Sequence, residues 1–206
     1  MVRNWKEVPV PERMRSLPRD PFRQFPIIFS QIPPIPDWVP SFESPHDFRA
    51  VLTERVIECA ARRLCGVCGQ PLDYWIAFLG GPLSAKNRAY TEPPMHPECA
   101  RYAVQVCPYM VVQAVPRRES GAYGDLVRFD PTGTRDKPPA FGLYLTRSFK
   151  FEHSNVAMAR RDPHVKARIA VGLRVAVDTR SSHWLFTPGT AKAIEWYREG
   201  ERVDAP

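Results

Sequence analysis

The chain has 206 residues, of which 44% are hydrophobic, and this is enough for one or two compact domains with a buried core. Its formal net charge of +7 and isoelectric point of about 9.4 permit binding to nucleic acid or another acidic surface. It has no run of about 18 or more apolar residues and no apolar leader, so we expect neither a transmembrane helix nor a signal peptide. The five cysteines are odd in number and have metal-type spacing, which indicates a reducing interior and a cytoplasmic protein.

Residues 1–43 are predicted to form a proline-rich extended arm. Nine prolines between positions 9 and 40 exclude a long helix, because proline breaks a helix interior. The segment is nevertheless rich in aromatic and aliphatic residues, in which disordered chains are poor. We therefore expect an ordered arm along the domain surface, with residues 27–29 as a short edge strand. Such an arm either straps its own domain or binds a partner.

The second region, residues 44–115, is predicted to combine a helix with a zinc-binding module. Ser44 can cap a helix that has Pro45 at its first position and Asp47 at its third. Apolar residues then recur at helical spacing from Phe48 to Leu64. This pattern predicts an amphipathic helix that leads directly into a cysteine-rich segment.

Two pairs of candidate metal ligands follow. Cys65 and Cys68 form a CxxC turn in which two thiolates can converge on one cation, and the neighbouring glycines at 66 and 69 permit the tight turn. His96 and Cys99 flank Pro97, which is favoured at the first position of a helix, and this helix is expected to run from 97 to 107. His96 and Cys99 are three residues apart and face the same side. A Cys3His set suits Zn²⁺, so we expect one zinc ion at these four residues.

The segment between the two pairs indicates a hairpin. Residues 74–78 have the composition of a strand, the Gly-Gly-Pro run at 80–82 breaks it, and residues 88–91 can return as the partner strand. The order of turn, hairpin and helix resembles a treble-clef zinc finger, over about a fifth of the chain. Four protein ligands would leave no open position, so the zinc is expected to be structural, and no catalytic residue is assigned.

The other cysteines are not expected to bind the same ion. Cys107 lies about 12 Å beyond Cys99 along a helix, and Cys59 falls on the apolar face of the preceding helix. Both are expected to be small buried hydrophobic residues. The alternative for the two ligand pairs is that they too are ordinary core residues.

The remainder of the chain is predicted to be a polar loop at 116–139 and a β-rich region at 140–206. Strands are expected within residues 141–151, 168–177, 184–186 and 193–197, and Glu199-Gly200 is a candidate hairpin turn. Four or five short strands indicate a small antiparallel sheet packed on the zinc module. The predicted fold class is therefore α+β.

Several short segments resemble a group of uncharacterised proteins from actinobacteria and their phages. These segments are residues 64–69, 78–82, 87–88, 92–96, 99–100, 107–108, 145–147 and 196–200. The resemblance extends from about residue 25 onward. It implies that the two ligand pairs belong to one zinc site and that the protein is encoded by a phage or prophage. It implies no activity.

The charge pattern favours a binding protein. Between positions 62 and 118 seven basic residues face three acidic ones, a net charge of +4. We expect a zinc-stabilised, non-enzymatic protein that engages a host protein or a nucleic acid through this basic surface. The basic residues are Arg62, Arg63, Lys86, Arg88, Arg101, Arg117 and Arg118.

The alternative hypothesis is a metal-dependent nuclease, because treble-clef scaffolds host His-Asn-His endonucleases. Such an enzyme needs a general-base histidine on the hairpin, to activate water beside a second metal ion. No histidine occurs between Cys68 and His96, and Asn87 alone cannot serve. Nicking of a plasmid in the presence of magnesium or manganese would support the nuclease.

Overall fold

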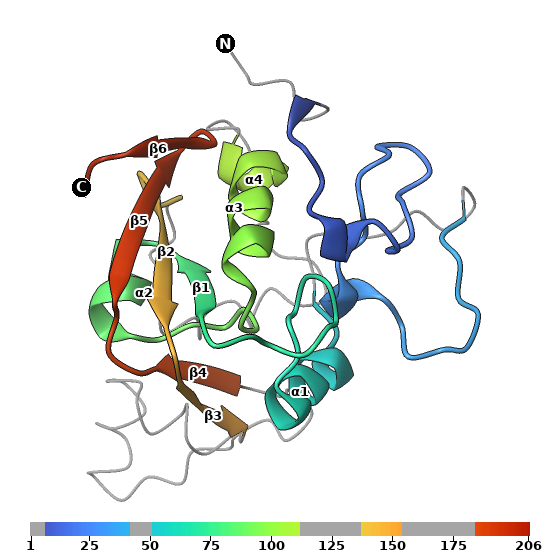
Figure 1. Ribbon diagram of the computed structural model, residues 1–206, viewed down its shortest axis with the longest axis horizontal. Coiled ribbons are helices and arrows are strands. Elements are labelled where there is room, and N and C mark those ends of the chain that lie inside the picture. Colours follow the sequence, from blue (N-terminus) through green and yellow to red (C-terminus); the bar gives the residue numbers. More distant parts are fainter. Residues whose placement is uncertain (1–6, 42–50, 112–136, 154–183) are drawn as a thin grey trace, which may run out of the picture.

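The computed structural model describes residues 7–41, 51–111, 137–153 and 184–206 (Figure 1). Helices and antiparallel strands are both present there, so the predicted α+β class is confirmed. None of the described helices has the length and apolar character needed to cross a membrane. The elements in chain order are the 3-10 helices η2 (Glu12–Met14) and η3 (Phe29–Gln31), α1 (Thr53–Arg62), β1 (Ile76–Gly80), α2 (Pro82–Asn87), α3 (Pro97–Val106), α4 (Pro108–Val111), β2 (Phe141–Thr146), β3 (Phe149–His153), β4 (Trp184–Pro188), β5 (Ala193–Arg198) and β6 (Glu201–Val203).

A four-stranded antiparallel sheet of order β1-β2-β5-β6 is the larger of two sheets, and β3 and β4 pair separately (Figure 1). β1 comes from the cysteine-rich segment and pairs with β2 from Ile76, opposite Thr146, to Gly80, opposite Gly142. The predicted small antiparallel sheet is therefore present. It incorporates a strand of the cysteine-rich segment, whereas the sequence predicted a sheet packed on that segment as a separate layer.

Both faces of β1 are buried, and alternate residues belong to two different cores. Ala77 and Leu79 share one hydrophobic cluster with Val104 of α3. Ile76 and Phe78 point to the other face and share a second cluster with residues of α2, β3 and β4. As a result α3 covers one face of β1 and β2, and α2 contacts the same two strands from the other face.

The prediction that residues 88–91 form the second strand of a hairpin is wrong. The Gly-Gly-Pro run ends the strand as predicted, since β1 stops at Gly80, but it then begins α2, with Gly81 as the extended N-cap and Pro82 in the first turn. Residues 88–91 do not pair with β1. Within the described residues β1 instead pairs with β2 and with Met95, which exchanges two backbone hydrogen bonds of 2.7 and 2.9 Å with Ala77. The segment just before α3 is thereby fixed against β1.

The helix expected from Ser44 begins later. Leu52 has an extended backbone and is the N-cap of α1, so the helix starts at Thr53, and the predicted capping residues at 44–47 lie outside the described residues. The Leu52 backbone N–H donates to the carbonyl oxygen of Ser30 at 2.8 Å, which ties this end to the N-terminal segment. Val56 and Cys59 are buried on the inner side of α1, in agreement with the predicted apolar face.

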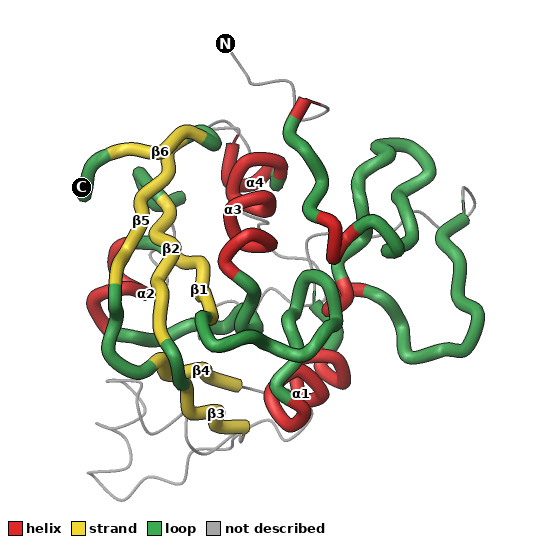
Figure 2. The backbone as a smooth tube through the Cα atoms, in the orientation of Figure 1, coloured by secondary structure: helices red, strands yellow, loops and turns green. Residues whose placement is uncertain are grey.

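The described part of the N-terminal segment, residues 7–41, is mostly loop with two short helical turns (Figure 2). The edge strand predicted at 27–29 is wrong, because Phe29 begins η3. Backbone N–H groups of Phe29 and Ser30 donate to the carbonyl oxygens of Val67 and Gly66, at 2.8 and 2.9 Å. These donors bind the cysteine-containing turn, so they are not available to a sheet. Met14 is buried in the same cluster as α3.

The C-terminal strands are confirmed where they can be compared, except that the strand predicted at 141–151 is two strands, β2 and β3, which belong to different sheets. Strands occupy residues 141–146, 149–153, 184–188 and 193–198, and the candidate turn at Glu199-Gly200 joins β5 to β6 with φ values of 52° and 82°. The strand predicted at 168–177 and most of the loop predicted at 116–139 lie outside the described residues.

One ion pair ties α3 to the sheet. Arg101 of α3 donates two hydrogen bonds to the carboxylate of Glu195 on β5, at 3.0 and 2.6 Å, and the hydroxyl of Tyr197 donates a third at 2.9 Å. The hydrogen bonds from Arg101 and then Tyr197 hold the pKa of Glu195 below its usual value, although burial opposes this shift. The side chain of Glu195 is only 10% exposed, so its charge depends on these partners.

Replacing Arg101 by alanine should lower the free energy of unfolding by about 1–3 kcal/mol, because a nearly buried carboxylate loses its cationic partner. Urea unfolding of the full chain measures this change. The control is Lys86→Ala on α2, an exposed lysine whose loss should change stability by less than about 0.5 kcal/mol. Equal unfolding midpoints for the Arg101 variant and the unmodified chain would contradict a structural role for this pair.

Candidate metal centre

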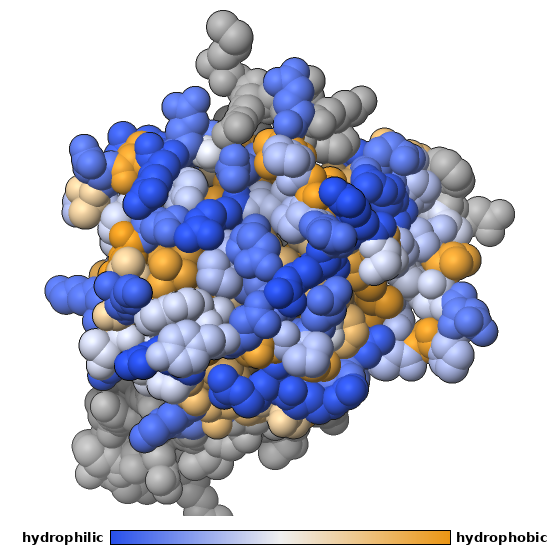
Figure 3. Space-filling view, viewed as in Figure 1, coloured by the Kyte–Doolittle hydropathy of each residue, from blue (hydrophilic) through white to orange (hydrophobic). Residues whose placement is uncertain are grey.

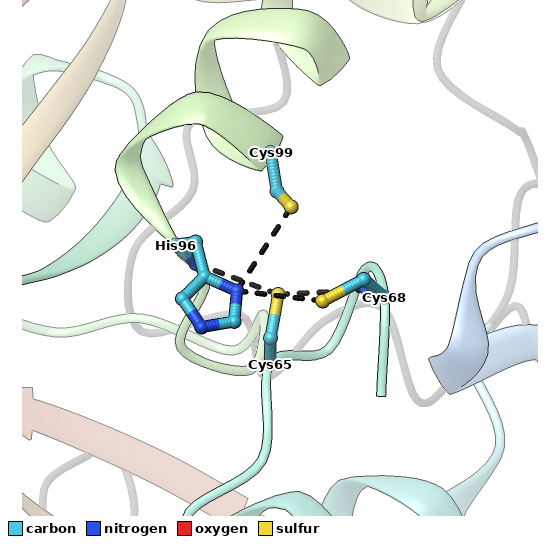
Figure 4. A group of neighbouring side chains, drawn as sticks. All are labelled: Cys65, Cys68, His96 and Cys99. Carbon is cyan, nitrogen blue, oxygen red and sulfur yellow. Dashed lines mark hydrogen bonds between the residues drawn. The ribbon is translucent and has the colours of Figure 1, made fainter. Parts of the chain in front are cut away.

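The structure brings the four predicted ligand residues, Cys65, Cys68, His96 and Cys99, into one buried cluster (Figure 4). Their ligand atoms all lie within 4.8 Å of one another, and no residue of the set is more than 7% exposed. The Nδ1 atom of His96 is 3.3 Å from the Cys68 sulfur and 4.0 Å from the Cys99 sulfur. Such separations match donors arranged around a single cation, whose bonds to sulfur and nitrogen are about 2.0–2.3 Å long.

The first two ligands come from a tight turn. The backbone N–H of Gly69 donates to the carbonyl oxygen of Cys65 at 2.8 Å, and the N–H of Cys68 points at the Cys65 sulfur at 3.5 Å. Gly69 has φ +75°, a left-handed conformation that favours glycine, and a Cβ atom there would lie 2.6 Å from the ring of Phe29. The predicted need for glycine at this position is confirmed.

The other two ligands come from the start of α3. His96 is the N-cap with an extended backbone, Pro97 occupies the first helical turn, and Cys99 follows within that turn, as predicted. The backbone N–H of His96 points at the Cys65 sulfur at 3.4 Å, so the two ligand pairs are also joined directly. A helix N-terminus carries partial positive charge, which favours the thiolate form of Cys99 once a cation is present.

A backbone carbonyl fixes the orientation of the histidine ring. His96 Nε2 lies 2.9 Å from the carbonyl oxygen of Pro71, so it carries the proton and donates it to that acceptor. The Nδ1 atom is then directed at the sulfurs, where a metal ion would replace its proton. Metal-binding histidines are held in this way by an outer hydrogen bond, which selects the tautomer needed for ligation.

The electrostatics of the cluster fit a cation. Burial alone would lower the pKa of His96, but hydrogen bonds to Cys65 and Cys68 outweigh it and raise this pKa to about 10. Hydrogen bonds from Cys65 and Cys99 lower the pKa of Cys68, whereas the hydrogen bond with Cys65 raises that of Cys99. The buried thiols therefore share protons among themselves, and a divalent cation would replace those protons. The cluster can hold one metal ion.

Arg13 is a contributor that sequence reasoning missed. It comes from η2, and its guanidinium pairs with Asp73 at 2.6 Å and with Glu98 at 2.8 Å. It also lies 3.4 Å from both the Gln70 side-chain oxygen and His96 Nε2. The N-terminal segment is thereby joined to the cysteine turn and to α3 beside the cluster. A single arginine in a proline-rich stretch carries no spacing signal that could have indicated this role.

Cys59 and Cys107 lie outside the cluster, as predicted. Cys59 is fully buried on α1, and burial raises its thiol pKa to about 12. Cys107 is the half-buried C-cap of α3, and burial raises the pKa of its thiol too.

The basic residues proposed for a partner surface are distributed over several elements. Arg62 pairs with Glu58 within α1, and Arg63 at the end of α1 places its guanidinium 5.1 Å from the ring centre of Phe149. Lys86 and Arg88 are exposed at the end of α2. The charge of Arg101 is matched by Glu195, and Arg117 and Arg118 lie outside the described residues.

Comparison of the chain with protein-family models, curated proteins and solved structures gives no significant match. What the site can bind therefore follows from the chemistry of its own side chains.

Replacing Arg13 by alanine should destabilise the protein by about 1 kcal/mol, because two partly exposed ion pairs are removed together. Arg15→Ala is the matched control, since Arg15 is an exposed neighbour on the same segment. Urea unfolding gives the stability, and amide hydrogen exchange around Met14 should become faster in the Arg13 variant alone. Equal exchange in both variants would show that Arg13 does not hold the N-terminal segment in place.

Proposed function

We propose that the protein is a zinc-stabilised binding protein without catalytic activity, which engages a partner protein or a nucleic acid. The observation that carries this proposal is the closed set of three buried sulfurs and one imidazole nitrogen at Cys65, Cys68, His96 and Cys99. Thiolate and imidazole ligands in a four-coordinate site are the donors that Zn²⁺ prefers.

The closed geometry supports a structural role for the ion. Four protein donors complete a tetrahedral shell, which leaves no position for water or substrate. An ion there would link the turn at Cys65–Cys68 to α3, and through Val67 and Gly66 it would also stabilise the attachment of the N-terminal segment. Zinc bound only in the folded state would contribute its binding free energy to folding.

Surface chemistry supports a charged or polar partner. The net charge is +7. On the face shown in Figure 3, hydrophilic side chains predominate, and the hydrophobic ones form small separate groups. Long-range attraction to an acidic partner, followed by local contacts, fits such a surface better than the burial of one large apolar area.

Purified protein should contain about one zinc ion per chain, because four ligands form one site. Cys99→Ser should lose the ion and most of the cooperative unfolding transition, since one thiolate is removed and the remaining buried donors lose their cation. Cys107→Ser is the matched control, because Cys107 is at the other end of the same helix and outside the cluster. Elemental analysis together with thermal unfolding measures both effects.

Two results would contradict the zinc assignment. One is a purified chain that is fully folded without metal and unaffected by a strong chelator. The other is equal zinc content in the Cys99→Ser and Cys107→Ser variants, which would place the ion elsewhere.

A further inference from the structure

The four-stranded sheet brings three sequence-distant residues to the same end of neighbouring strands. The last pair between β1 and β2 is Ile76 with Thr146. The last pair between β2 and β5 at the same end is Leu145 with Ala193. The residues immediately beyond these pairs are Trp75, Arg147 and Lys192. Neighbouring strands lie about 4.8 Å apart, so these three side chains start from adjacent strand ends.

Their contacts form a surface of alternating rings and cations, which we call the strand-end patch and define as Tyr74, Trp75, Arg147 and Lys192. The guanidinium carbon of Arg147 is 5.5 Å from the ring centre of Tyr74 and 5.8 Å from that of Trp75. The ammonium nitrogen of Lys192 is 4.5 Å from the ring centre of Trp75. The two rings meet edge to face with centres 5.1 Å apart.

The patch is open to solvent and positively charged. Tyr74 is 64% exposed, which is unusual for a large aromatic side chain, and both cations are exposed. Within the described residues neither Arg147 nor Lys192 forms an ion pair with a carboxylate. The acidic residue that precedes Tyr74 in the chain, Asp73, is already paired with Arg13. A ligand that carries negative charge would therefore complement this patch.

We propose that the strand-end patch binds single-stranded nucleic acid, with a base stacked on Tyr74 and phosphates held by Arg147 and Lys192. This inference rests on the proposed function in its nucleic-acid form. Exposed aromatic rings beside cations are how proteins bind single strands with little sequence preference, since every base has a flat face and every nucleotide one charge. A duplex offers the same charges, but its bases are already stacked and cannot cover the Tyr74 ring.

An acidic peptide fits the surface less well. It could neutralise Arg147 and Lys192, but carboxylates would leave the exposed Tyr74 ring without a stacking partner. A single strand offers both a base that can stack on the Tyr74 ring and phosphates that can pair with Arg147 and Lys192. Three properties would therefore distinguish single-strand binding from peptide binding. The protein should bind single strands, it should bind them more weakly when the Tyr74 ring is removed, and the two cations should set the salt dependence of the affinity.

The test uses the zinc-loaded full chain and fluorescence anisotropy of labelled single-stranded DNA and RNA of about 15 nucleotides, with a duplex of equal length. Tyr74→Ala should weaken single-strand binding about fivefold to a hundredfold. The double variant Arg147→Gln/Lys192→Gln should reduce the steepness of log affinity against log salt by about 0.7 for each phosphate that is no longer neutralised. Arg202→Gln removes one exposed charge from β6, at the other edge of the sheet from β1, and should leave affinity nearly unchanged.

Zinc content of every variant is measured in the same preparations. If Tyr74→Ala loses its zinc, the double variant decides the question through its salt dependence. The inference is overturned by absence of single-strand binding at low salt, by duplex binding of equal strength, or by an effect of Arg202→Gln as large as that of the double variant. A chain that keeps its zinc but binds no single strand leaves the zinc-stabilised protein with a protein partner. A folded chain without zinc overturns the proposed function itself.

Discussion

The convergence of three sulfurs and one imidazole on a single point is the constraint on which the rest of the structure depends. These donors are buried, and buried thiolates without a cation would repel one another. Their position fixes how the turn at residues 65–69 meets the first turn of α3. Met95, adjacent to the histidine ligand, pairs with Ala77 of β1, so the same constraint positions an edge strand of the sheet. The cluster and the sheet are thus parts of one unit.

The ligand set could be predicted from the sequence because its signals are local. A CxxC turn with glycine at Gly69 and a proline just inside the start of α3 each act over a few residues, and both lie where the sequence predicts them. The strands at 141–151 and 193–198 and the Glu199-Gly200 turn are similarly encoded by short patterns of alternation and turn chemistry.

The predictions are wrong where distant parts of the chain decide the structure. The Gly-Gly-Pro run is compatible with either a turn or a helix start, and the partner of β1 is β2, which a local hairpin assignment could not identify. Residues 27–29 have strand composition, but the backbone N–H of Ile27 donates to Pro18 and that of Phe29 donates to Val67 in the cysteine turn. Arg13 has no motif around it, and its role follows from where Asp73 and Glu98 are placed by folding. Pairings of this kind are properties of the assembled structure.

The sharing of β1 between the cluster and the sheet has a consequence for biosynthesis. All four ligands precede residue 107, so they leave the ribosome before β2, which begins at Phe141, and well before β5. During translation the cluster can close while β1 still has no sheet partner, and an unpaired strand edge favours association between nascent chains. Met95 pairs with Ala77 on the side of β1 away from β2, so the cluster holds the strand itself in place until β2 is made. Under the proposed zinc assignment, the supply of metal while the chain is being synthesised would therefore affect how much of it reaches the paired sheet.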